Sequence, residues 1–154
     1  MNYGNYLLAG FLTLSMAACS ATGARTQQPL AGYPYRHQAF DLNVAWKTVS
    51  SGQGTSVEGV VQNVRYVQVR DMEVTVLLLD GKKVLARGRS FTSPNRIDRD
   101  DMAGFDLYLN ASPRPGDLLQ FIIQYQALDD ASNSFHWLGS FTVDALSGKS
   151  REKP

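Results

Sequence analysis

The chain has 154 residues, of which 44% are hydrophobic, which suits one globular domain or two small ones. Its 15 Lys and Arg nearly balance its 14 Asp and Glu, and the formal charge of +1 argues against a nucleic-acid binder and against a polybasic membrane-surface protein. A single cysteine excludes an internal disulfide and a four-thiolate zinc site.

The N-terminus has the features of a targeting signal. Residues 1–18 carry no charged side chain, and Tyr6–Ala18 is an apolar run shorter than the roughly 20 residues that span a membrane. The run ends at Met16-Ala17-Ala18-Cys19, which resembles the lipobox of bacterial lipoproteins, although Met16 replaces the usual leucine and no Lys or Arg precedes the run. The resemblance implies a signal peptide over residues 1–18 and lipidation of Cys19. An ordinary signal peptide cut after Ala18, with Cys19 incidental, is the alternative.

The residues after Cys19 bear on location. Ser20, rather than aspartate, follows the cysteine, which resembles the pattern that permits transport to the outer membrane. We therefore expect a lipid anchor on the periplasmic side of the cell outer membrane; a soluble secreted or periplasmic protein is the alternative. Residues 19–39 are mostly small and polar without apolar periodicity, which predicts a flexible tether between lipid and domain.

From residue 40 onward, apolar residues recur at every second position, which predicts strands with one buried face. Seven segments show this pattern: Phe40–Lys47, Val57–Gln62, Met72–Leu79, Val84–Phe91, Phe105–Leu109, Leu119–Gln126 and Phe135–Val143. Asp80-Gly81 between the third and fourth predicts a tight hairpin. We predict an all-β domain over residues 40–144, an immunoglobulin- or fibronectin-III-like antiparallel β-sandwich of about seven strands, followed by a frayed polar tail over 145–154. A closed barrel is the alternative.

Three segments carry a family resemblance. Val57-Glu58-Gly59-Val60-Val61-Gln62-Asn63, the hairpin Leu79-Asp80-Gly81-Lys82 and the strand Gly104-Phe105-Asp106-Leu107-Tyr108-Leu109 follow one another in this order. In this they resemble the FxLYD-type immunoglobulin-like domains over about residues 40–143. The resemblance implies a fold and an extracytoplasmic setting, but no activity and no catalytic residue.

The sequence offers no supported catalytic or metal-binding constellation. It has two histidines, His37 and His136, and no Gly-x-Ser-x-Gly elbow, so we expect no enzyme activity. Asp98-Arg99-Asp100-Asp101 contains oxygen ligands that calcium accepts, but it lacks the glycine and closing glutamate of a calcium loop. We therefore interpret it as a solvated loop, and expect neither a metal nor a cofactor.

Aromatic residues permit a second interpretation. Trp46 and Trp137 both fall in phase with the apolar side of their strands, so we expect both in the core. Exposed Tyr33, Tyr35 and Tyr108 would suit a carbohydrate- or cell-wall-binding module of the envelope, which is the alternative function.

The solvent side of one sheet is the strongest candidate for binding. If the third, fourth, sixth and seventh predicted strands form one sheet, its outer side collects apolar Leu77, Ile122 and Leu138 within a polar rim. The rim comprises Arg87, Arg89, Gln120 and Gln124, and Thr75 lies beside them; the three apolar residues with the two arginines and two glutamines are the candidate binding residues. We therefore expect a non-catalytic, lipid-anchored binding or accessory module with an envelope protein as its partner.

Overall fold

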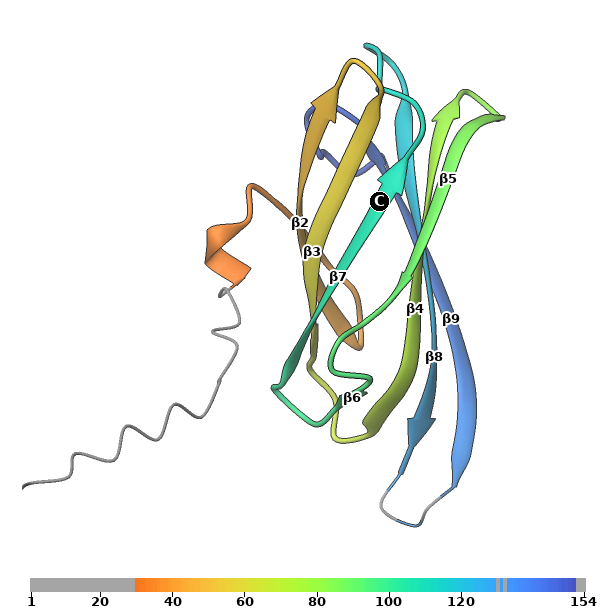
Figure 1. The fold of residues 1–154 in the computed structure, drawn as a ribbon. Coiled ribbons are helices and arrows are strands. Elements are labelled where there is room, and N and C mark those ends of the chain that lie inside the picture. The colour runs from red at the N-terminus through yellow and green to blue at the C-terminus, as the bar shows by residue number, and fades with distance from the viewer. Residues whose placement is uncertain (1–29, 130, 132, 152–154) are drawn as a thin grey trace, which may run out of the picture.

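The chain folds into two packed antiparallel β-sheets, shown in Figure 1. The computed structural model describes residues 30–129, 131 and 133–151. After a short 3₁₀ turn, Leu30–Gly32, the strands are β1 (Tyr35–Gln38), β2 (Leu42–Ser51), β3 (Gly54–Asn63), β4 (Gln68–Asp80), β5 (Lys83–Phe91), β6 (Arg96–Ile97), β7 (Met102–Leu109), β8 (Leu118–Leu128) and β9 (Ser134–Asp144).

The first sheet has the order β1-β2-β3-β7, and the second has the order β5-β4-β8-β9 with β6 paired to β4. The sandwich prediction is confirmed, and all seven predicted strands are present. The two that periodicity missed, β1 and β6, are only four and two residues long, too short to show a period. The predicted Asp80-Gly81 hairpin joins β4 and β5, with Gly81 in the left-handed region at φ 59°.

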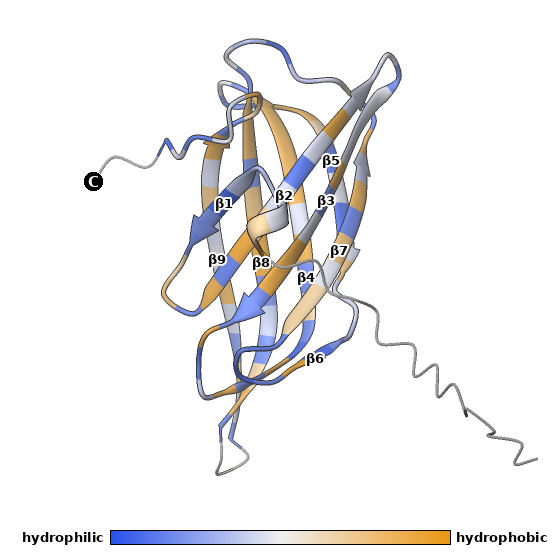
Figure 2. Cartoon of the chain, turned by 90° about the vertical axis from the view of Figure 1, so that its left-hand side faces the viewer, coloured by the Kyte–Doolittle hydropathy of each residue, from blue (hydrophilic) through white to orange (hydrophobic). Residues whose placement is uncertain are grey.

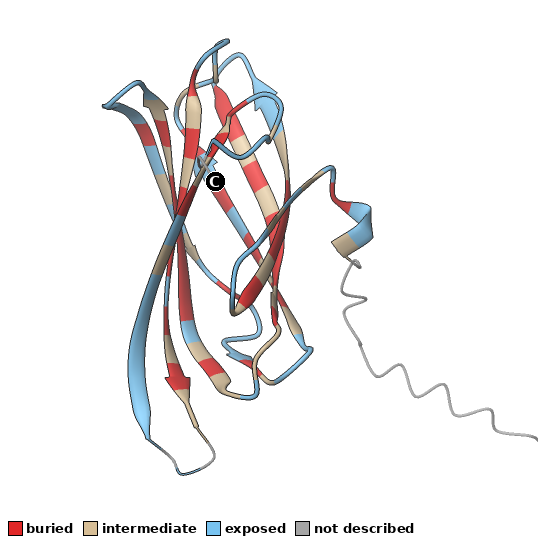
Figure 3. Ribbon diagram, turned by 180° about the vertical axis from the view of Figure 1, so that it is seen from behind, coloured by how far each residue is buried: buried red, intermediate tan, exposed pale blue. Residues whose placement is uncertain are grey.

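Hydrophobic, buried residues alternate with polar or more exposed ones along many of the strands (Figures 2 and 3). The buried residues of both sheets form one core between them. The aromatic centre of this core is Trp46, which is fully buried as predicted. Its ring lies 4.7 Å from that of Phe121 and 5.8 Å from that of Phe141, measured between centroids. The Phe121 and Phe141 rings stack at 4.8 Å.

The folded domain is longer at both ends than the expected 40–144. On the N-terminal side, β1 pairs with β2, and Tyr33 is buried in a small cluster with Ala45 and Val60 on the outer side of the first sheet. Residues 33–38 are therefore part of the domain and not of a tether. On the C-terminal side, Ala145 is buried and Ser150 bridges Val143. The segment up to residue 151 folds back onto β9 because backbone groups at the end of that strand give it hydrogen-bond partners.

The sandwich is not closed along its whole length. The β8–β9 hairpin extends beyond the ends of β2 and β3, so the start of β9 has no opposite sheet (Figure 1). Trp137 is 45% exposed and Phe135 is 40% exposed for this reason. The prediction that Trp137 belongs to the core is wrong. Phe40, also in phase with the core, is exposed because it lies in the β1–β2 turn, with Arg65 4.2 Å over its ring.

The signal peptide, Cys19 and most of the expected tether lie outside the described residues. Within the described part of the chain, no helix has the length and apolar character needed to cross a membrane.

Candidate binding face

The outer side of the second sheet brings the seven predicted binding residues together. Strand register arranges it as rows that run across β5, β4, β8 and β9. We call three of these rows the outer face: Phe91–Glu73–Gln124–Leu138, Arg89–Thr75–Ile122–Ser140 and Arg87–Leu77–Gln120–Thr142. All seven predicted residues are among these twelve, because the strands predicted to share a sheet do share one.

An apolar line crosses the outer face diagonally. Leu77, Ile122 and Leu138 lie on adjacent strands, each displaced by one row from the next. Diagonal neighbours in an antiparallel sheet are about 7–8 Å apart, within reach of long side chains. Leu77 and Ile122 are half-buried, whereas Leu138 is 68% exposed. The exposed end of the line therefore lies on β9, at the edge of the sheet.

The β5 side of the outer face is charged and polar. Glu73 is buried, its carboxylate lies 3.7 Å from the guanidinium of Arg89, and it accepts a hydrogen bond of 3.3 Å from the Thr75 hydroxyl. Arg89 and Arg87 are exposed. Because Arg89 pairs with the buried Glu73 carboxylate, the Arg87 guanidinium is available to solvent or to a partner.

A hollow of about 470 Å³ adjoins Leu138. Its lining includes Gln124, Gln126 and His136 of the β8–β9 hairpin, together with Asp71. Asp71 has φ 50° and lies where the register between β4 and β8 shifts, so the β4 backbone bulges at this point. The hollow extends the outer face toward the open end of the sandwich.

Sequence reasoning missed two features of this region. Phe91 is 63% exposed and begins the row that ends at Leu138. Its outward position follows from its two-residue spacing from Arg89 and Arg87, so the sequence carries this signal. The Asp71 bulge had no such signal, because a bulge depends on the partner strand.

A second, smaller hollow of about 180 Å³ opens between the β1–β2 turn and β9. His37 stacks on Phe141 there, with ring centroids 3.8 Å apart. The Tyr125 hydroxyl donates a hydrogen bond to the Asp41 carboxylate. Burial, followed by this hydrogen bond, raises the pKa of Tyr125 well above its ordinary value of 10.0. Ser140 also lines the hollow, although it precedes Phe141 on β9 and its side chain therefore lies on the other side of the sheet.

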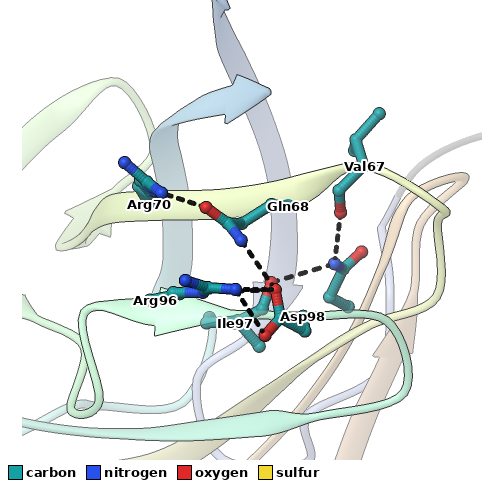
Figure 4. A network of polar contacts seen from close by, with 7 residues as sticks. Val67, Gln68, Arg70, Arg96, Ile97 and Asp98 are labelled. Carbon is teal, nitrogen blue, oxygen red and sulfur yellow. Dashed lines mark hydrogen bonds and ion pairs between the residues drawn. The ribbon is translucent and has the colours of Figure 1, made fainter. Parts of the chain in front are cut away.

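The acidic segment Asp98–Asp101 forms a turn closed by a hydrogen bond from the Asp101 N–H to the Asp98 carbonyl oxygen, and Asp98 joins a polar network (Figure 4). Asp98 accepts a 2.8 Å hydrogen bond from Gln68 and pairs with Arg96 at 3.2 Å, and these two contacts lower the pKa of Asp98. Beside it, the buried Asn63 amide donates to the carbonyl oxygens of Val67 at 2.8 Å and Ile97 at 3.2 Å. In the described residues, no three His, Cys, Asp or Glu side chains gather as a metal site.

The three tyrosines of the alternative interpretation do not form one platform. Tyr33 is buried, and Tyr35 packs on Trp46 at 5.8 Å while its hydroxyl donates to the Leu146 carbonyl oxygen. Only Tyr108 of the three is exposed. The expectation that all three are available was wrong because the residues before 40 belong to the folded domain.

Comparisons with known proteins give a distant structural likeness. No protein-family model and no curated protein matches the chain. Among solved structures, the GAE domain of yeast GGA1 is 11% identical with a TM-score of 0.45, covering 71% of this chain and 98% of its own. The GAE domain of GGA2p from Saccharomyces cerevisiae is 12% identical with a TM-score of 0.43, covering 70% and 96%. A protein from Archaeoglobus fulgidus is 15% identical with a TM-score of 0.34, covering 72% and 99%.

These likenesses are too distant to carry an argument about function. The class of the chain, an all-β immunoglobulin-like sandwich, rests on its own strand pairings. The FxLYD resemblance over about residues 40–143 rests on the quoted motif residues alone.

Proposed function

We propose that this sandwich is a non-catalytic protein-binding module of the bacterial cell envelope, and that the outer face contacts its partner. The observation that carries the proposal is the diagonal apolar line with its exposed end at Leu138, next to a hollow and opposite a basic side. Apolar centres with polar, Arg-containing rims are typical of protein interfaces. The partner is an envelope protein whose contact surface is apolar with an acidic margin to meet Arg87.

Location is the second part of the proposal. A lipid on Cys19 holds the module at the periplasmic side of the outer membrane, and the residues that follow give it reach. Its support is the lipobox-like sequence before Cys19.

The face is tested by affinity purification from membranes with the full chain. Leu138→Asp places a charge at the exposed end of the apolar line, and we expect loss of the co-purified partner with the circular dichroism spectrum unchanged. Leu146→Asp is the matched control, because Leu146 is 48% exposed but lies outside the outer face. Equal capture by both variants would contradict the proposed face.

The anchor is tested separately by fractionation. The Cys19→Ala protein should move from the membrane fraction to the soluble fraction and should no longer incorporate labelled palmitate. Continued acyl labelling after this substitution would exclude Cys19 as the lipidation site. The partner-binding face would remain open to its own test, since the two parts rest on different residues.

A further inference from the structure

The edge of β9 is open to another strand. β9 is the last strand in the order of the second sheet, so one side of it has no neighbouring strand along Ser134–Phe141 among the described residues. Its first half, Ser134–Leu138, is also exposed on both faces. Such an edge presents unpaired backbone N–H and C=O groups to any strand that can align with it.

The hydrogen bonds at the end of β9 show which residues face this side. Thr142 accepts at its carbonyl oxygen from Arg151 N–H at 3.0 Å, and Asp144 N–H donates to the Lys149 carbonyl oxygen at 2.9 Å. Backbone groups alternate sides along a strand, so residues of the same parity face the same way. Among the described residues, the open edge of β9 therefore comprises Ser134, His136, Leu138 and Ser140, and the C-terminal segment up to Arg151 covers the edge from Thr142 onward.

β9 lacks the charged residues that the other edge strands of this fold carry. The three other edge strands each carry charge: Arg36 in β1, Lys83, Arg87 and Arg89 in β5, and Asp106 in β7. In contrast, Ser134–Val143 has no Asp, Glu, Lys, Arg or Pro, and β9 pairs with β8 without a register shift. Charges, prolines and bulges are the usual protection of an edge strand. Because Ser134–Val143 carries none of these charges, this part of β9 can meet its counterpart in a second copy without repulsion between them.

We propose that β9 pairs with β9 of a second copy of this chain, antiparallel and about a two-fold axis at Trp137. The four open residues are symmetric about position 137, so this register uses all of them: Ser134 pairs with the second copy's Ser140, and His136 with the second copy's Leu138. Trp137 then lies opposite its own copy in a non-hydrogen-bonded pair, where Cα atoms approach to about 4.5 Å. Cross-strand aromatic pairs of this kind stabilise sheets.

The inner side of the pair also fits. In this register, Phe135 of each copy lies opposite Gly139 of the other. A Cβ added at Gly139 would meet no atom within 4 Å, and Gly139 lines the hollow of about 180 Å³ beside Phe141. An aromatic ring from the second copy can therefore enter space that this chain leaves empty. Pairing covers Phe135, Trp137 and Leu138, the exposed apolar residues of β9.

A charge-swap experiment on the full chain tests both the dimer and its register. In sedimentation under density-matched detergent, wild type should be a dimer, whereas Trp137→Lys and Trp137→Glu should each be monomers, because identical charges would face each other. An equimolar mixture of the two variants should restore the dimer, since only position 137 lies opposite itself. Leu85→Lys, on the opposite edge strand β5, is the control and should leave the dimer intact.

A wild type that sediments as a monomer at every concentration would overturn the proposal, even if it captured a strand of a different protein. Dimers that persist in both single variants would also overturn it. So would a mixture that stays monomeric while both variants keep the wild-type circular dichroism spectrum.

If Trp137 variants do not fold, Ser140→Pro serves instead, because it removes an N–H of the open edge without removing one that bonds to β8. Its dimer should weaken, and an unchanged dimer would contradict the open-edge assignment. Because Leu138 lies on both the outer face and the open edge, the pull-down is repeated with Trp137→Lys. A monomeric Trp137→Lys protein that still captures the envelope partner keeps the proposed function separate from the dimer.

Discussion

Trp46 and Trp137 have the same position in the pattern of their strands and opposite environments in the fold. Trp46 is 0% exposed and packs against the stacked rings of Phe121 and Phe141, whereas Trp137 is 45% exposed. Both side chains lie on the inner side of their sheet, as alternation requires. The difference is the sheet across from each of them. The second sheet covers Trp46, whereas the first sheet ends before it reaches Trp137. Alternation therefore determines the side of a strand, while burial depends on the extent of the layer across from it.

The boundary between the two environments lies at one cross-strand pair. Tyr125 of β8 is directly opposite Trp137 of β9, yet Tyr125 is only 5% exposed. Its hydroxyl reaches Asp41 in the β1–β2 turn, so this contact marks where the first sheet stops covering the second. Beyond it, the β8–β9 hairpin continues as an exposed ribbon.

Truncation of the two tryptophans should show the largest difference. Trp46→Ala removes a fully buried ring and leaves a cavity, so we expect a loss of about 4 kcal/mol in the free energy of unfolding. Trp137→Ala should cost about 1 kcal/mol or less, because solvent already covers much of the ring. Urea unfolding followed by circular dichroism measures both at a protein concentration where the chain is monomeric. Equal losses would mean that the open end is closed in solution.

Asn63→Ala should have the next largest effect. This buried amide donates to two carbonyl oxygens and accepts from the Arg65 N–H at 2.9 Å, which ties the β6 loop to the end of β3. Its removal leaves three backbone groups without that partner, and we expect a loss of about 3 kcal/mol in unfolding free energy. Asn43→Ala is the control, since the Asn43 side chain donates one hydrogen bond, to the half-buried Gln62 side chain, among the described residues. A small effect at Asn63 would show that water replaces the amide there.

Tyr125→Phe tests the boundary contact and should cost about 1.5 kcal/mol at neutral pH through the lost hydrogen bond to a carboxylate. The pH dependence has a definite sign. Because the folded state raises the pKa of Tyr125 above 10.0, its contribution is complete below pH 10 and declines as pH rises above that value, when the unfolded state releases the proton. The difference in unfolding free energy between wild type and Tyr125→Phe should therefore decrease above pH 10. A difference that stays constant would contradict the buried environment of this phenol.

Leu138→Asn should have the smallest effect on stability, within about 0.5 kcal/mol, because the side chain is 68% exposed. Chemical unfolding of the monomer measures it beside Ile122→Asn, where the half-buried side chain should cost more. If both variants lose stability equally, Leu138 is covered in solution.

Much of the fold could be predicted because long strands repeat their pattern. The alternation in Met72–Leu79 and Leu119–Gln126 identified β4 and β8, and Asp80-Gly81 identified the turn between β4 and β5. β1 could not be predicted, because four residues give no period and its pairing depends on β2. The return of residues 145–151 to β9 rests on backbone hydrogen bonds, which side-chain patterns do not encode.

The candidate face was predictable to a similar degree. Placing Leu77, Ile122 and Leu138 on one side required only strand parity and the order of an immunoglobulin-like sheet. The hollow beside Leu138 was not predictable, because it depends on the bulge at Asp71 and on how far the hairpin extends. Asn63 was visible as a motif residue, but its side-chain hydrogen bond to the Ile97 carbonyl oxygen, 34 residues along the chain, depends on the fold.

In the proposed dimer, the C-terminal segment that pairs with the end of β9 determines the register in which two copies pair. It stops the open edge at Ser140, so the midpoint of that edge falls on an aromatic residue. Removing residues 145–154 would free Thr142 and Asp144 and move the midpoint to Gly139, which would place Trp137 opposite Phe141 and change the geometry of association. A purification tag fused at this end would sit beside the same edge, so its position becomes a variable in any measurement of oligomeric state.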